Sequence, residues 1–289
     1  EITNIGTLFI VQFFSSKKVA LVWNIRHSLY HIEDEKKLTQ LVIKANRFFS
    51  KSADTLLYNS HISRQQHEEF GFSAKYGLVI PNGINCQQFC FSVEARQRIR
   101  TELTIPLKAL VVGHIARFHP MKDHANFLQA AVDVAKKHPN TYFLLSGRGV
   151  CSKNTEVTQY IISSLQNRFH FLGERADVAD LMSSMDILCS SSRGEAFPNV
   201  LGEAMATGIP CVATDVGDSA LIIADCGVVA PPRNKIALAE GVESLLNLPN
   251  EEREKLGLRA RQRIEDNFKL NVIVDKYAEL YEKLRMNEC

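Results

Sequence analysis

The fold is decided by one stretch of the sequence, Ser191-Ser192-Arg193-Gly194-Glu195-Ala196-Phe197-Pro198-Asn199-Val200-Leu201-Gly202-Glu203-Ala204-Met205-Ala206-Thr207-Gly208-Ile209-Pro210. Two carboxylates, Glu195 and Glu203, stand eight positions apart in it. Pro198 is typical of the first position of a helix, and Gly208 of the residue just past a helix end, so a helix is predicted between them. Short apolar runs at 186–189 and 211–213 flank this helix and predict buried strands.

The same alternation fills the rest of the chain. Further strands are predicted at 19–25, 55–58, 76–80, 109–115, 142–145, 169–173 and 228–229. Further helices are predicted at 33–53, 123–138, 155–167, 176–184, 234–248, 251–266 and 271–286, with another that stops at Gly71. The buried side of the helix at 123–138 is expected to carry Phe127, Ala130, Ala131, Val134 and Ala135. The pattern predicts an α/β protein whose parallel sheets are covered by helices on both faces.

Composition narrows the class of protein. The 289 residues suggest one large or two ordinary domains. There are 34 basic and 32 acidic residues without a long run of like charge, so nucleic acid is not expected as a partner. No apolar run approaches the roughly 20 residues of a membrane span. The cysteine count is odd and no C-x-x-C occurs, which predicts free thiols, a reducing compartment and a cytoplasmic protein.

The loop that follows the strand at 109–115 carries two cations, Arg117 and Lys122. Ligands of open parallel sheets bind at the carboxyl ends of strands, so this loop is a candidate diphosphate site. A solvated basic loop is the alternative interpretation. The loop 146–149 contains a G-x-G, which is more typical of an ordinary turn. The strand end at Phe171 and Leu172 offers backbone groups to a flat base, or is simply a strand end.

The predicted helix start supplies a second candidate. The amides of Asn199, Val200 and Leu201 have no partner inside the helix and favour an anionic phosphate. Glu195 and Glu203 lie at different depths and suit different hydroxyls of one sugar nucleotide; the alternative is a helix-terminus charge and a solvated Glu. In the first part of the chain, His27 follows a strand and is either a general base or a structural histidine.

These motifs resemble those of the family 4 glycosyltransferases, which have the two-domain GT-B architecture. The resemblance rests on Gly113-His114-Ile115-Ala116-Arg117 with Lys122-Asp123-His124, on Phe171-Leu172-Gly173, and above all on the E-x7-E element from Glu195 to Glu203. Asn59-Ser60 and Ile80-Pro81-Asn82-Gly83-Ile84-Asn85 resemble the closing segment of the family's first domain. The likeness covers nearly the whole chain.

The resemblance implies a role for each matching residue. Arg117 and Lys122 would hold the donor diphosphate, Glu195 would bind sugar hydroxyls, and Glu203 would bind the ribose. His27 falls near the family's active-site histidine. The catalytic set is then His27, Arg117, Lys122 and Glu195, and the donor-binding set is Gly113, Arg117, Lys122, Phe171, Leu172, Glu195, Phe197, Pro198, Asn199, Val200, Leu201 and Glu203. No metal site and no cofactor are expected.

The same resemblance implies a retaining, metal-independent transfer of a sugar from a UDP- or GDP-sugar to a glycan or lipid-linked acceptor, in polysaccharide or glycolipid biosynthesis. Two alternatives stay open: a non-catalytic nucleotide-sugar-binding remnant, and a UDP-sugar epimerase of GT-B type. Peripheral association with the inner face of the membrane is a further expectation.

The domain boundaries are predicted from a break in the pattern. Residues 86–106 are polar and irregular and are interpreted as a linker. Residues 1–90 would form a partial, acceptor-side Rossmann-like domain onto which the helix 271–286 packs, and residues 103–270 the donor-binding domain. The first domain is short for the family, which predicts a missing upstream portion and an incomplete sheet that favours self-association.

Overall fold

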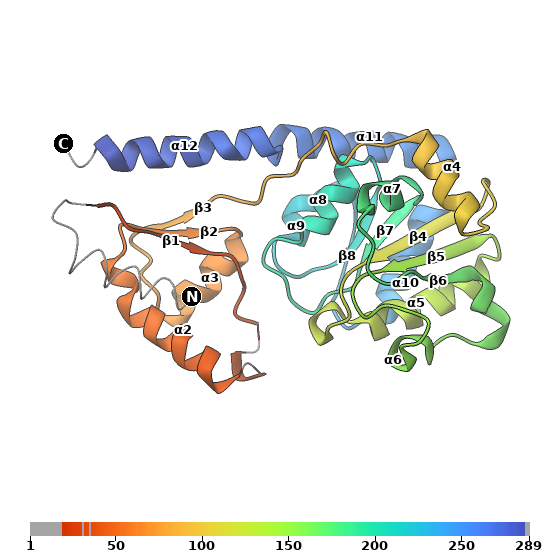
Figure 1. Ribbon diagram of the computed structural model, residues 1–289, viewed down its shortest axis with the longest axis horizontal. Coiled ribbons are helices and arrows are strands. Elements are labelled where there is room, and N and C mark those ends of the chain that lie inside the picture. Colours follow the sequence, from red (N-terminus) through yellow and green to blue (C-terminus); the bar gives the residue numbers. More distant parts are fainter. Residues whose placement is uncertain (1–18, 31, 35, 287–289) are drawn as a thin grey trace. The chain divides into compact units, whose positions relative to one another are not determined.

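The computed structural model describes residues 19–30, 32–34 and 36–286. The chain forms two compact units (Figure 1). The first comprises Glu1–Gly83, Glu195–Phe197 and Leu270–Cys289, and the second comprises Ile84–Gly194 and Pro198–Lys269.

The second unit is built on a six-stranded parallel sheet with the order β6-β5-β4-β7-β8-β9. The strands are β4 (Leu110–Ile115), β5 (Thr141–Ser146), β6 (Phe169–Phe171), β7 (Ile187–Ser190), β8 (Cys211–Thr214) and β9 (Gly227–Ala230). The four residues of β7 and of β8 are all buried, as expected for strands that helices cover on both faces. The predicted strands of this unit are confirmed.

Helices cover both faces of this sheet (Figure 1). α5 (His124–Lys137) and α10 (Lys235–Leu246) pack on one face in a single apolar cluster, and α7 (Val178–Ser183), α8 (Asn199–Ala206) and α9 (Ser219–Ile223) lie on the other. α11 (Asn250–Asn267) crosses α8 where Gly257 meets the backbone of Gly208. The five residues expected on the inner side of α5 are all buried.

Two predictions for this unit were wrong. The segment 155–167 is one turn of helix, α6 (Thr155–Thr158), and a separate 3-10 helix, η4 (Ser163–Arg168), because Ile162 between them is extended. The expected linker contains a helix, α4 (Val93–Glu102). Ser92 caps α4 by accepting from the amide of Ala95, and the arginines that made the segment look solvated are ion-paired with distant aspartates.

The first unit has a three-stranded parallel sheet with the order β1-β2-β3. The strands are β1 (Val22–Ile25), β2 (Thr55–Tyr58) and β3 (Gly77–Val79). The predicted segment 33–53 is α2 (Lys37–Phe49) between two 3-10 turns, η1 (Ile32–Asp34) and η2 (Ser50–Ser52), and the next helix is α3 (His61–Phe70). The left-handed Gly71 ends α3, as expected.

Different helices cover the two faces of this three-stranded sheet. Trp23, Leu56 and Tyr58 face a cluster that includes Ile43 of α2 and Phe72 after α3. On the opposite face, Leu57 and Ile80 pack against Ile273 and Leu280 of α12 (Leu270–Met286). The helix α12 is therefore part of the first unit's core.

In the part of the chain that the structure describes, no helix is long and apolar enough to cross a membrane. The six described cysteines are free. Cys189 and Cys211 are buried in adjacent strands, where burial raises the pKa of both thiols.

Candidate active site

The loop after β4 presents the two predicted cations at the carboxyl end of the second unit's sheet. Arg117 is exposed, and Lys122 is half-buried at the end of a 3-10 turn, η3 (Pro120–Lys122). The ring of His119 starts this turn by accepting from the amide of Met121. The loop then enters α5 through Asp123, whose φ of 47° lies in the left-handed region. We call residues 116–123 the cation loop.

The buried Ser191, which directly follows β7, fixes the backbone of the cation loop. Ser191 Oγ lies 2.9 Å from the carbonyl oxygen of Lys122 and 3.1 Å from that of Asp123. The same hydroxyl lies 3.1 Å from Nε2 of His114, which projects from β4. One fully buried hydroxyl thus fixes the backbone at Lys122.

An ion pair joins the same two segments a second time. Arg193 Nη2 lies 2.8 Å from Asp123 Oδ1, and the Arg193 amide donates to the carbonyl of Met121 at 2.8 Å. The side chain of Asp123 is buried, and its hydrogen bond raises the pKa of Arg193. The carboxylate of Asp123, the residue before α5, makes no cap bond to this helix and is directed to Arg193 instead.

Two buried histidines lie behind the cation loop. The rings of His114 and His124 meet with their centroids 4.7 Å apart, and His114 also packs on Phe127. Burial lowers the pKa of His124 to about 4, and burial, followed by the neighbouring His124 and Lys122, places the pKa of His114 well below its usual range. Both rings are therefore neutral at pH 7, and they add no charge to the site.

The second predicted element, the start of α8, begins one residue later than expected. Pro198 is the N-cap, with a ψ of 93°, and the helix starts at Asn199. Asn199 is exposed, Val200 is half-buried and Leu201 is buried. The amide of Leu201 donates a hydrogen bond to the carbonyl of Pro198 at 3.1 Å. Glu203 lies further inside α8, where burial raises the pKa of its carboxyl group.

The remaining predicted residues are distributed over both units. His27, Glu195 and Phe197 belong to the first unit, and Arg117, Lys122 and Asn199–Glu203 to the second. Ser63 of α3 donates a hydrogen bond to the carbonyl of His27. Within the second unit, the structure brings together the cation loop and residues 191–194, which follow β7.

Gly113 lies inside β4 and not in a loop. A Cβ at this position would come within 2.0 Å of the sulfur of Met185, so the glycine makes room for a core side chain. Phe171 ends β6 and packs at the border of the core, and the amide of the next residue, Leu172, donates to the carbonyl of Leu145.

The G-x-G loop after β5 supports the cation loop. Phe118 donates its amide to the carbonyl of Arg148 at 2.7 Å. A Cβ on Gly147, which has a φ of 149°, would lie 2.1 Å from the carbonyl oxygen of Ala116, so only glycine permits this approach. This turn therefore supports Ala116 and Phe118, the residues on either side of Arg117.

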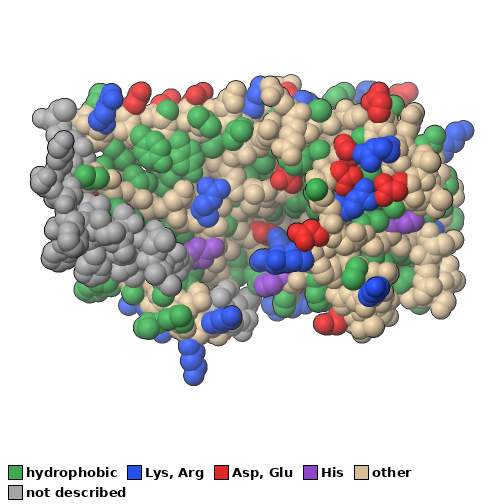
Figure 2. Space-filling model, viewed as in Figure 1, with side chains coloured by type: hydrophobic (Ala, Val, Ile, Leu, Met, Phe, Trp, Pro, Cys, Tyr) green, Lys and Arg blue, Asp and Glu red, His purple; other side chains and the backbone are tan. Residues whose placement is uncertain are grey.

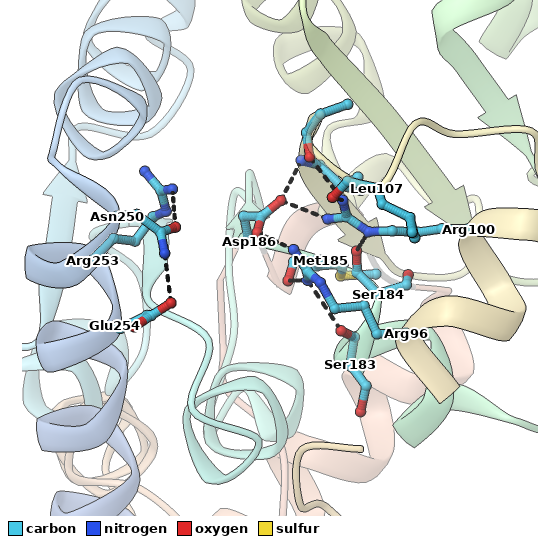
Figure 3. Close-up of polar contacts among 12 residues, drawn as sticks. Arg96, Arg100, Leu107, Ser183, Ser184, Met185, Asp186, Asn250, Arg253 and Glu254 are labelled. Carbon is cyan, nitrogen blue, oxygen red and sulfur yellow. Dashed lines mark hydrogen bonds and ion pairs between the residues drawn. The ribbon is translucent and has the colours of Figure 1, made fainter. Parts of the chain in front are cut away.

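A large cavity of about 1040 Å³ lies at the other end of the sheet, beside the amino ends of β4, β7 and β8. None of the predicted site residues lines it. Figure 3 shows Arg96, Arg100 and Asp186 on one side, with Asn250, Arg253 and Glu254 of α11 on the other. These groups already pair among themselves, since Arg96 and Arg100 both bind Asp186 and Asn250 bonds to Glu254 and Arg253. The cavity therefore offers few unused polar groups.

Among the described residues, no group of three or more His, Cys, Asp and Glu side chains could hold a metal ion. Three residues that support the cation loop, Ser191, Arg193 and Asp123, were not given these roles from the sequence. All three lie in the quoted motifs, but their partners are about 70 positions away, and nothing local in the sequence indicates the pairing.

Comparison with known proteins gives a consistent picture. The model of the family described as "Glycosyl transferases group 1" matches residues 95–263, more than half of the chain. EpsF of Bacillus subtilis is 31% identical over 138 residues, which are 47% of this chain and 35% of EpsF. The UDP-Gal:alpha-D-GlcNAc-diphosphoundecaprenol alpha-1,3-galactosyltransferase of Escherichia coli is 22% identical over 268 residues, which are 91% of this chain and 69% of that enzyme.

Among solved structures, Anabaena Alr3699/HepE in complex with UDP superposes with a TM-score of 0.84 at 24% identity. The match covers 98% of this chain and 75% of HepE. The chain thus spans about a third of the length of EpsF and three quarters of HepE. The likeness confirms the expected α/β architecture of GT-B type, with two Rossmann-like sheets of which one has three strands.

Proposed function

Because the chain belongs to the group 1 glycosyl transferases, we propose that it moves a sugar from a nucleotide-sugar donor to a glycan or lipid-linked acceptor. The observation that carries the proposal is the fixed cation loop, in which Arg117 and Lys122 stand at the carboxyl end of β4. This is the edge at which open parallel sheets bind nucleotides. HepE, which shares the fold, was solved with UDP and with UDP-glucose, which favours a UDP-sugar over a GDP-sugar as donor.

The proposed mechanism follows from where negative charge grows during transfer. The bond between the anomeric carbon and the diphosphate breaks, and the charge of the leaving group increases. Arg117, Lys122 and the first amides of α8 would stabilise this charge, and preorganised donors in a dry site contribute several kcal/mol. These groups do the work of a divalent cation, so the transfer is proposed to be metal-independent. The anomeric carbon becomes oxocarbenium-like, an acceptor hydroxyl forms the new bond to it and gives its proton to the departing diphosphate, and the configuration is proposed to be retained.

The remaining roles complete the proposal. Glu195 would bind sugar hydroxyls, Glu203 the ribose, and His27 would act on the acceptor side. The proposed place of action is the cytoplasmic face of a membrane, where a lipid-linked acceptor is available.

The test combines binding and turnover. Calorimetry with UDP and GDP measures donor binding, and a transfer assay with UDP-sugars, followed by NMR of the anomeric product, measures activity and stereochemistry. Lys122→Ala and Arg117→Ala should each lower kcat/KM by about a hundredfold or more. Lys137→Ala, which removes only an exposed ion pair with Glu243, is the matched control. Full activity of the Lys122 variant would refute the assignment.

A non-catalytic role is the second candidate, because the described residues of the first unit form a sheet of three strands. It predicts UDP binding that Lys122→Ala abolishes, without sugar transfer or epimerisation by the unaltered chain. Turnover of a UDP-sugar in the absence of acceptor, with conversion to its epimer, would instead support the epimerase.

A further inference from the structure

The cavity beside the amino ends of β4, β7 and β8 belongs entirely to the second unit, since every residue that lines it lies there. Its volume of about 1040 Å³ is sufficient for a small organic molecule. It lies at the opposite end of the sheet from the cation loop. An occupant of this cavity would therefore bind apart from the donor.

Large apolar side chains from three separate segments line the cavity and are exposed. Phe91, Leu107 and Leu258 are 47%, 60% and 67% exposed. The buried side chains of Met185 and Ile209 also contribute to the lining. Exposed apolar groups that converge on one cavity form a surface that the apolar body of a ligand would cover with a gain in free energy.

A buried guanidinium lines the same cavity without pairing to a carboxylate. Arg253 is 6% exposed and donates to the carbonyls of Leu245 and Leu248 at 3.4 and 3.1 Å and to Asn250 Oδ1 at 3.0 Å. These three acceptors are neutral, and a guanidinium has five N–H groups to donate. The carboxylate of the neighbouring Glu254 accepts from Asn250 Nδ2 at 2.6 Å instead. Within the described residues, Arg253 therefore has no ion-pair partner.

Several other arginines of the second unit do face carboxylates. Arg96 and Arg100 share Asp186. Figure 2 shows acidic and basic side chains interleaved over α7, where Arg98 pairs with an aspartate of that helix. A buried charge costs free energy unless an opposite charge compensates it. A bound anion at Arg253 would supply this compensation.

The lining as a whole has an excess of positive charge. Its charged side chains are four basic and two acidic ones, namely Arg96, Lys108, Arg253 and Arg261 against Asp186 and Glu254. The exposed Lys108 adds to the charge of the buried guanidinium. The potential in the cavity therefore attracts anions and disfavours cations.

We propose that this cavity is a binding site for a small organic anion with an apolar body. The negative group pairs with Arg253, and the apolar body covers Phe91, Leu107 and Leu258. Figure 3 shows Arg253 on α11, across the cavity from Arg96 and Asp186. The proposal does not depend on the donor site, which lies at the other end of the sheet.

The test uses two fluorescent probes that share one apolar body. Anilinonaphthalene sulfonate carries a negative charge, and phenylnaphthylamine is the same body without the sulfonate. We expect the full chain to bind the sulfonate at one site, about tenfold or more tightly than the neutral probe. Saturating UDP should not displace it, because the donor is proposed to bind at the cation loop.

Variants of the lining separate the two parts of the site. Arg253→Met should weaken binding of the sulfonate by about tenfold or more, and Lys108→Gln by about threefold, with little effect on the neutral probe. Leu258→Ser should weaken binding of both probes by about threefold. The matched controls, Lys255→Gln on the same helix and Ile236→Ser on α10, alter exposed side chains outside the lining and should leave both affinities unchanged.

A second measurement locates the probe without any substitution. Cys90 lines the cavity and is exposed, whereas Cys151 is half-buried and lies outside the lining. Bound sulfonate should slow the alkylation of Cys90 by N-ethylmaleimide by about threefold or more, because a ligand in a pocket covers its walls. The alkylation of Cys151 should not change. Peptide mass spectrometry measures both rates.

Equal affinity for the two probes would overturn the proposal, as would sulfonate binding that Arg253→Met and Lys108→Gln leave unchanged. Displacement of the sulfonate by UDP would also overturn it, because the probe would then occupy the donor site. Far-UV circular dichroism verifies the folding of each variant. If Arg253→Met does not fold, Lys108→Gln and the alkylation of Cys90 decide the outcome.

Discussion

The carboxylate of Asp123 and the guanidinium of Arg193 lie 2.8 Å apart and join two loops that are 70 positions distant in the sequence. Asp123 directly follows Lys122, the predicted diphosphate ligand, and its backbone is held in a left-handed conformation. The position of Lys122 therefore depends on a contact that a sequence motif does not include. Ser191, which bonds to the carbonyls of both Lys122 and Asp123, adds to the same constraint.

The first prediction concerns this ion pair. Asp123→Ala should lower the free energy of unfolding by about 1–3 kcal/mol, because a buried acceptor is lost and alanine disfavours positive φ. Asp123→Asn should cost less, since asparagine tolerates the left-handed region and keeps an acceptor for Arg193. Urea denaturation measures both values. Equal losses for the two variants would contradict the role of the side chain.

The same variants should also affect the donor site. With the cation loop less restrained, Asp123→Ala should weaken UDP binding by about tenfold, and Asp123→Asn by less. Calorimetry at constant ionic strength gives the affinities. If Asp123→Ala lost stability but bound UDP normally, the ion pair would be purely structural.

The second prediction is a dependence of stability on pH. The pKa of His124 is about 4 in the folded protein and 6.5 when the residue is exposed, so the unfolded chain binds the proton first. The lowered pKa of His124 therefore contributes about 3 kcal/mol to the free energy of unfolding at neutral pH. This contribution is complete above pH 6.5 and is lost as the pH falls to about 4. His114, whose pKa is also lowered, adds in the same direction.

Urea denaturation between pH 7.5 and pH 4.5, repeated with His124→Gln, tests the assignment. The variant should show a shallower loss of stability over this range. A parallel loss in both proteins would assign the effect to other groups.

The third prediction concerns the buried guanidinium of Arg100. Its Nη2 lies 2.8 Å from Asp186 Oδ2, and its other nitrogens donate to the carbonyls of Ser184, Leu107 and Ala109. Asp186→Ala should cost about 3–5 kcal/mol, because it leaves this charge unpaired. Arg98→Ala, which breaks exposed pairs with Asp177 and Asp180, should cost less than about 1 kcal/mol. Chemical denaturation of the two variants should therefore give very different midpoints.

The fourth prediction tests why position 113 is a glycine. Gly113→Ala should destabilise the second unit by about 1–3 kcal/mol, because the new methyl group meets the buried side chain of Met185. Met185→Ala removes the obstacle, so the double variant should lose less stability than the sum of the two single variants. Additive losses would show that Gly113 is needed for another reason.

The sequence predicted the fold well where the signal is local. Each predicted strand of the second unit is present, because a short run of apolar residues must be buried on both faces. The left-handed Gly71 and Gly208 follow helix ends, as their positions indicated. The inner face of α5 was also predicted residue by residue, because the helical spacing of its apolar residues is a local signal.

Predictions that depend on distant partners were less successful. Segment 86–106 looked like a linker because Arg96 and Arg100 made it polar, but both arginines bind Asp186, about 90 positions away. The apolar spacing of α2 is helical, yet it gave no sign that Leu38, Leu41 and Phe48 are exposed. Asp123, Ser191 and Arg193 were not predicted to support the cation loop, because their partners also lie far away in the sequence.

The discontinuity of the first unit has a consequence for how the chain acquires its structure during synthesis. Leu57 and Ile80 precede the second unit in the sequence, but α12, which covers them, follows it and leaves the ribosome later. One face of the β1-β2-β3 sheet therefore remains exposed to solvent while the whole second unit is translated and can fold. The sheet of the first unit is made before the second unit and is covered only after it, and during this interval its uncovered face is a target for chaperones.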